Sequence, residues 1–112
     1  MATLTVASVA RTLTPIAAVA AAAGGDAFAN SGQEFLYIAN GSGASITVTA
    51  AIQKAIDGVT PAGKSIIVPA TSAAVFGPFN PADYNDNTGK VTITYSGVTT
   101  LTVQPFQMVN FK

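Results

Sequence analysis

The stretch EFLYIANGSGASITVTAAI, residues 34–52, decides the fold class. Residues 34–39 are rich in aromatic and branched apolar side chains, and even-numbered apolar residues from Ile46 to Ile52 alternate with threonines, a pattern typical of half-buried strands. Between them, Asn40-Gly41 is the strongest short hairpin signal, because both residues tolerate positive φ. The stretch therefore predicts two short strands, residues 34–39 and 45–52, joined by a turn.

The same pattern of short apolar segments between turn residues continues along the chain. It predicts strands at residues 4–9, 64–68, 73–79, 90–95 and from residue 101 towards the end, with residues 73–79 short, bent or at a sheet edge because of Gly77-Pro78. Residues 16–25 are ambiguous between helix and strand, since the alanine run is short and ends at Gly24-Gly25, and a strand followed by a loop is favoured. Seven or eight short strands at this spacing predict one all-β domain over residues 1–112, an antiparallel sandwich or barrel of the jelly-roll kind.

Charge is scarce in this chain. Only 9% of the residues are charged, against about 25% in an ordinary soluble domain, and the formal net charge is zero. A surface so poor in charge is suited to packing against other protein. With no basic run to neutralise phosphates, the sequence argues against nucleic acid and against an anionic membrane surface as partners.

The apolar run Ile16 to Ala23 is the one membrane-like stretch in the sequence. It is far shorter than the roughly 20 residues that a transmembrane helix needs. As the centre of a signal peptide it is preceded by a single positive residue, Arg11, and by several threonines, which make a poor leader. A cytosolic product is therefore expected.

Residues for catalysis are missing from the composition. The chain has no His and no Cys, so the usual nucleophilic triads and zinc sites cannot be built, and no disulfide can form. The few carboxylates show no spacing typical of paired acid–base chemistry. The sequence predicts no enzymatic activity, no cofactor and no metal.

The loop from Asp83 to Gly89 has Asp and Asn oxygens at alternating positions and a glycine at the seventh position. It resembles a loose calcium loop, but it lacks the glycine at the sixth position and the later bidentate glutamate of the helical calcium loop. The simpler interpretation is that its Asp and Asn side chains cap their own backbone turns.

Two segments are candidates for contact with a partner. Residues 1–14 carry a single charge and could form an extended N-terminal arm that adds a strand to a neighbour's sheet, or the first strand of the chain's own sandwich. The aromatic residues around Gly77-Pro78 could be an exposed docking point or core residues at a bend. The predicted contact residues are Thr3, Leu4, Thr5, Val6 and Val9 in the arm, and Phe76, Phe79 and Tyr84 in the loop.

The pattern of strands and turns resembles the small head decoration, or cement, proteins of tailed bacteriophages. The resemblance lies in residues 35–41 and 45–49, in Phe76-Gly77-Pro78-Phe79, in Tyr84-Asn85-Asp86, in the paired strands 91–95 and 100–103, and in the opening residues 4–9 with Arg11 and Thr14-Pro15. The alanine run 20–23 departs from that pattern. The resemblance implies a β-rich protein, made in the host cytoplasm, that binds the major capsid protein on the outer surface of the virion, often as a homotrimer.

The physics of attachment agrees with that expectation. A protein that binds the assembled shell and not the separated subunits stabilises the particle by mass action, and many copies act together. The alternatives are another virion component, such as a tail or head-completion protein, and a non-enzymatic calcium- or glycan-binding adhesin-like domain that uses the Asp83 to Gly89 loop.

Overall fold

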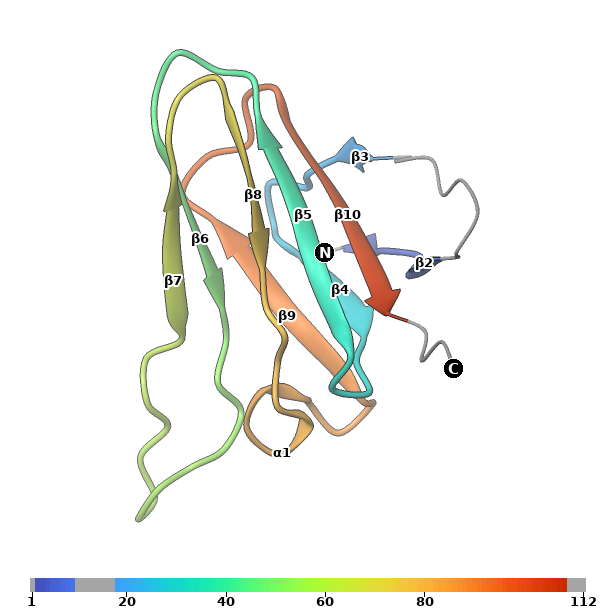
Figure 1. The fold of residues 1–112 in the computed structure, drawn as a ribbon. Helices are drawn as coiled ribbons and strands as arrows, with labels where there is room; N and C mark the ends of the chain where they lie inside the picture. The colour runs from blue at the N-terminus through green and yellow to red at the C-terminus, as the bar shows by residue number, and fades with distance from the viewer. Residues whose placement is uncertain (1, 10–17, 109–112) are drawn as a thin grey trace.

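A computed structural model describes residues 2–9 and 18–108 of the chain (Figure 1). Its strands are β1 (Ala2–Thr3), β2 (Ala7–Val9), β3 (Val19–Ala20), β4 (Asp26–Ala29), β5 (Glu34–Asn40), β6 (Ile46–Ala50), β7 (Lys64–Val68), β8 (Ser72–Phe76), β9 (Lys90–Tyr95) and β10 (Leu101–Met108). A single helical turn, α1 (Pro81–Tyr84), precedes β9. The predicted all-β sandwich is confirmed.

Two sheets form the sandwich. The first sheet has the order β1-β4-β9-β6-β7, and the second has the order β2-β10-β5-β8, with β3 also paired to β10. Each sheet contains four antiparallel strands, and the short β1 and β2 extend them in parallel, β1 along β4 and β2 along β10. The sequence predicted seven or eight strands, and eight are antiparallel. They include β4, which was not predicted, while the predicted strand at residues 4–9 corresponds to the parallel β1 and β2.

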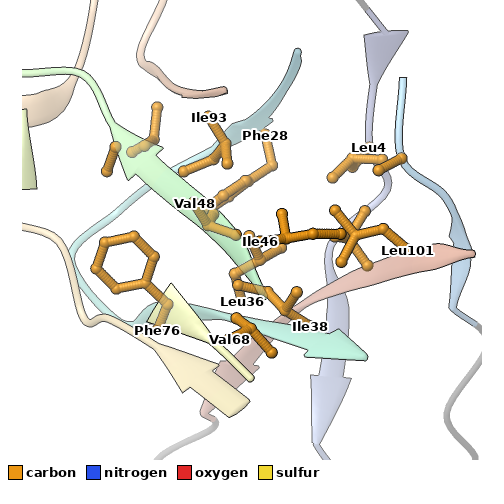
Figure 2. Close-up of a cluster of buried hydrophobic side chains, with 14 of the residues drawn as sticks. Leu4, Phe28, Leu36, Ile38, Ile46, Val48, Val68, Phe76, Ile93 and Leu101 are labelled. Carbon is orange, nitrogen blue, oxygen red and sulfur yellow. The ribbon is translucent and has the colours of Figure 1, made fainter. Parts of the chain in front are cut away.

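The core lies between the sheets and follows directly from the alternation in the sequence. Along β5 and β6 every second residue is buried, and the intervening residues face outward. Leu36 and Ile38 from β5 meet Val48 and Ile93 from the opposite sheet (Figure 2). All four side chains are fully buried, which supplies the apolar burial that stabilises a domain of this size.

The predicted turn at Asn40-Gly41 does not make a hairpin. β5 belongs to the second sheet and β6 to the first, so residues 41–45 cross from one sheet to the other. Neither Asn40 nor Gly41 has positive φ, and Asn40 remains in β5 with its side chain buried. Its amide Nδ2 donates to the carbonyls of Ala44, Val68 and Pro69, while its Oδ1 accepts from Ser42. The buried amide thus joins the two sheets, and this tertiary role overrides the local turn preference.

A two-residue turn forms instead at Asp57-Gly58, where both residues have positive φ. Ile56 and Val59 exchange both backbone hydrogen bonds across it, at 2.7 and 3.0 Å. This turn lies within the loop between β6 and β7, and the loop extends below the two strands in Figure 1.

The two lateral sides of the sandwich differ. On the side that we call the sealed side, residues 2–9 pair first with β4 and then with β10, so the segment crosses from one sheet to the other. On the side that we call the open side, β7 ends the first sheet and β8 ends the second, and the structure describes no strand beyond either (Figure 1). β8 is therefore an edge strand, one of the outcomes that Gly77-Pro78 predicted.

Candidate partner-binding surface

Residues 2–9 belong to the chain's own sandwich. Leu4 N donates to Ala27 O at 2.7 Å, and the Leu4 side chain is buried between the sheets. Thr3 and Thr5 are exposed, and Val6 is half-buried against the core. The alternative of a first strand therefore describes this segment better than a free arm, while the Val9 side chain and residues 10–14 lie outside the described residues.

Near this segment, a hollow of about 360 Å³ lies between residues 3–7 and β10. Thr3, Leu4 and Thr5 line it together with Gln104, whose Nε2 donates to Thr5 O at 3.2 Å. Three of the predicted arm residues thus meet at one surface hollow, but their backbone is already held by β4 and β10.

Phe76 and Phe79 are core residues. The exposed fractions of their side chains are 5% and 2%, and their rings meet nearly edge to face with centroids 5.0 Å apart. Phe79 also contacts Phe28 and Tyr84, at 6.0 and 5.4 Å between ring centroids. The prediction that these two phenylalanines form an exposed docking point is corrected, because the bend at Gly77-Pro78 turns both rings inward. Tyr84, at the end of α1, stays half-exposed.

Two asparagines hold the segment that carries these aromatics. Asn30 Nδ2 donates to Phe79 O at 3.1 Å and to Asn85 Oδ1 at 2.7 Å, and Asn85 Nδ2 donates back to Asn30 O at 2.8 Å. Asn80 caps α1, because its Oδ1 accepts from Ala82 N. These side-chain hydrogen bonds therefore fix the position of Tyr84, and no local sequence pattern predicted them.

On the open side, a groove of about 340 Å³ runs between β7 and the segment from β8 to α1. We call it the open-side groove, and its main lining residues are Lys64, Ile66, Val75, Phe76, Phe79 and Tyr84. It thus brings together all three aromatic residues predicted as a contact site, although the Phe76 and Phe79 side chains are almost completely buried. Lys64 and Ile66 were missed, because a strand residue near an edge carries no signal of what it faces.

The Asp83 to Gly89 loop is a self-capped turn. Asp86 Oδ1 accepts from Thr88 Oγ1 at 2.6 Å, from Thr88 N at 2.8 Å and from Lys90 N at 3.2 Å. The Thr88 hydroxyl, followed by the two backbone N–H groups, holds the pKa of the Asp86 carboxyl below its ordinary value of 3.8. Within the described residues, no group of three or more acidic, His or Cys side chains gathers at one point. The loop therefore follows the simpler of the two interpretations, an Asx-capped turn.

Asp26 is a fully buried acid whose role sequence reasoning missed. Its Oδ2 accepts from Tyr95 Oη at 2.7 Å and from Ala22 N at 3.2 Å, while its Oδ1 has no hydrogen-bond partner among the described residues. Burial, then the hydrogen bond to Asp26, raises the pKa of the Tyr95 hydroxyl well above its ordinary value. The pair fastens β4 to the end of β9 and lies away from the residues that line the open-side groove.

Most of the large exposed apolar side chains of the described residues belong to residues 56–75. Ile56, Val59, Ile67 and Val75 are each more than 60% exposed, and Val19 on β3 follows at 49%. Ile56 and Val59 flank the Asp57-Gly58 turn, Ile67 lies on β7 and Val75 on β8. Ile67 stands opposite Thr47 in β6 and Val75 opposite Tyr37 in β5, so these two side chains face outward from different sheets. The edge strands β7 and β8 and the turn before β7 are therefore a candidate contact surface.

Comparisons of the chain with protein families, with curated proteins and with solved structures gave no match. Among the residues that the structure describes, no helix is long and apolar enough to cross a membrane.

Proposed function

We propose that this chain is a structural virion protein that binds the outside of a capsid shell and stabilises it. The observation that carries the proposal is a surface with very few charges, together with four large apolar side chains in residues 56–75 that are each more than 60% exposed. Depletion of charged residues is typical of the core of protein–protein interfaces.

The chemistry of the surface favours a protein partner. Burying an unpaired charge in an interface is costly, and the few charges of this chain keep that cost low. The exposed side chains of β7 and β8 include Ser65, Ile67, Ser72, Ala73 and Val75, with Lys64 as their single charge. Such a surface can pack closely on the repeated subunits of a shell.

The resemblance to phage head decoration proteins supplies the identity of the partner in this proposal, the major capsid protein. It also supplies the expectation of a homotrimer on the outer face of the virion. A ligand that binds the assembled state and not the dissociated state shifts the equilibrium towards assembly. The protein thus acts as a clamp between shell subunits and catalyses no reaction.

Binding to shells tests the proposal. Purified protein is mixed with capsids that lack it, the capsids are sedimented, and the bound protein is quantified against the major capsid subunit. Saturation at a fixed ratio supports the proposal. Recovery of all the protein in the supernatant at every concentration contradicts it, and would shift the assignment to a tail or head-completion component.

A further inference from the structure

The sealed side of the sandwich shows how an extended segment closes this fold. Residues 2–3 pair in parallel with β4, residues 7–9 pair in parallel with β10, and Leu4 between them inserts its side chain between the sheets. Figure 2 shows Leu4 beside Leu101 at one end of the core, with Phe76 at the other end. One segment therefore pairs with the backbone of two sheet edges, and its Leu4 side chain fills the gap between the sheets.

The open side also has two sheet edges, those of β7 and β8, but the described residues include no segment that closes them. β7 pairs with β6 and β8 pairs with β5, and no described strand lies along the other edge of either. Unpaired edges carry free backbone donors and acceptors, which readily add a further strand. The open-side groove lies between these two edges.

The groove is lined by polar and apolar atoms in similar proportion and contains one cation without an ion-pair partner among the described residues. In the register with β6, Lys64 and Ile66 stand opposite Ala50 and Val48, which are buried, so both side chains belong to the inward-facing row of β7. No carboxylate of the described residues lies within ion-pair distance of the Lys64 ammonium. Phe76 and Phe79 also line the groove, although both side chains are almost completely buried.

We infer that the open-side groove binds an extended segment of the partner protein, which pairs with a free edge, inserts an apolar side chain between the sheets and places a carboxylate beside Lys64. An extended segment fits this site because both edges are free and because residues 2–9 close the opposite side in the same way. An acidic residue fits this site because its charge is complementary to that of Lys64. This inference rests on the proposed function, with the capsid subunit as the partner.

Two pairs of variants test the inference in the sedimentation assay. Lys64→Glu reverses the charge in the groove, and Lys54→Glu makes the same change at a residue that does not line it and whose ammonium lies 3.9 Å from the Asp83 carboxylate. Ile66→Ala shortens an inward-facing side chain, and Val19→Ala shortens an aliphatic side chain on β3 at the sealed side, which is 49% exposed. Lys64→Glu and Ile66→Ala are expected to weaken shell binding about tenfold or more. The two control variants are expected to bind shells within about twofold of the unmodified protein.

Hydrogen exchange separates strand addition from simple surface contact. Backbone amides along the free edge of β7 or β8 are expected to exchange at least about tenfold more slowly on the shell than in free protein, because an added strand accepts their hydrogen bonds. Thermal unfolding of each free variant checks that weaker binding does not reflect loss of the fold.

The outcomes distinguish this inference from the proposed function. If the unmodified protein does not bind shells, the proposed function is contradicted. If it binds and all four variants bind alike, with no slowing of exchange at either edge, the groove inference is overturned while the proposed function stands. If Lys64→Glu and Ile66→Ala instead dissociate a self-associated form of the free protein and leave shell binding unchanged, the occupant is a second copy of this chain, which also overturns the inference.

Discussion

At the residue scale, buried polar side chains hold this sandwich together at points that hydrophobic alternation does not mark. Asn40 connects the two sheets, Asn30 holds the aromatic segment 76–84, and Asp26 anchors Tyr95. A buried polar group is costly unless it is hydrogen-bonded, so loss of one partner exposes the full cost of burying the other.

Tyr95→Phe is expected to lower the free energy of unfolding by about 1–3 kcal/mol at neutral pH, because Asp26 keeps a single hydrogen-bond donor, Ala22 N. Urea unfolding measures the loss. Asp26→Asn in the same background provides the double-mutant comparison, and a fully additive result would contradict coupling between the two side chains.

The Tyr95 hydroxyl also predicts a loss of stability at alkaline pH. Its pKa is raised in the folded chain by burial and by Asp26, so the unfolded chain ionises first as the pH rises. The stability that the neutral hydroxyl contributes is present below about pH 10, the pKa of an unfolded tyrosine, and is lost as the pH rises above it. Unfolding measured between pH 8 and pH 11 should therefore show the difference between wild type and Tyr95→Phe shrinking above about pH 10. A constant difference would contradict the raised pKa.

The Asp86 carboxyl predicts a loss of stability at acid pH, because its pKa is lowered in the folded chain. Its carboxyl pKa is lowered, first by the Thr88 hydroxyl, so its contribution to stability is present above the ordinary value of 3.8 and is lost as the pH falls through the folded pKa. An NMR titration is expected to place this pKa below 3.8 in wild type and higher in Thr88→Val. An unchanged value in Thr88→Val would show that the Thr88 hydroxyl plays no part.

At the element scale, the strands with clean alternation were predictable and the exceptions have physical causes. The strands at 34–40, 46–50, 64–68 and 90–95 were anticipated within about two residues, because their buried faces repeat with a period of two. β4 was missed because its four residues, Asp-Ala-Phe-Ala, contain no β-branched residue and bury an acid. The hairpin at Asn40-Gly41 was wrong because the buried Asn40 amide joins the two sheets, which a local turn preference cannot reveal.

The candidate site was predictable only in part. The sequence singled out Phe76, Phe79 and Tyr84, and the structure does bring them together at the open-side groove. It could not show that two of these rings point into the core, because an aromatic residue beside a turn has the same pattern in a core as on a surface. Lys64 and Ile66 became candidates only once the register of β7 with β6 was known.

The turn before β4 provides a test at this scale. Gly25 has φ +94°, and a Cβ there would lie 2.6 Å from Ile93 O. Gly25→Ala is therefore expected to destabilise the fold by about 1–3 kcal/mol. Gly43→Ala, where a Cβ would meet nothing within 4 Å, is the control and is expected to change stability by less than about 0.5 kcal/mol. Equal melting temperatures for the two variants would contradict the described turn.

At the scale of the whole molecule, the asymmetry between a sealed and an open side is the main result. The sealed side depends on residues 2–9, so a deletion of residues 1–14 removes β1, β2 and the buried Leu4. If residues 1–14 were a free arm, the truncated chain would stay folded and lose only its partner. The structure predicts instead that truncation weakens the fold itself.

Leu4→Ala tests the sealed side without removing a strand. It is expected to lower the free energy of unfolding by about 2–3 kcal/mol, the lower part of the range for buried leucines, because Leu4 lies at the margin of the core. Thr5→Ala, at an exposed neighbour, should unfold nearly as the wild type does. Equal unfolding of the Leu4→Ala variant and wild type would show that residues 2–9 do not close the sandwich.

Sedimentation of the purified protein with capsids that lack it, paired with light scattering of the free protein, tests the central claim most directly. The proposal predicts saturable binding at a fixed ratio to the major capsid subunit, and the scattering mass shows whether trimers form before attachment. A stable monomer that remains in the supernatant at every concentration would contradict the assignment to the shell.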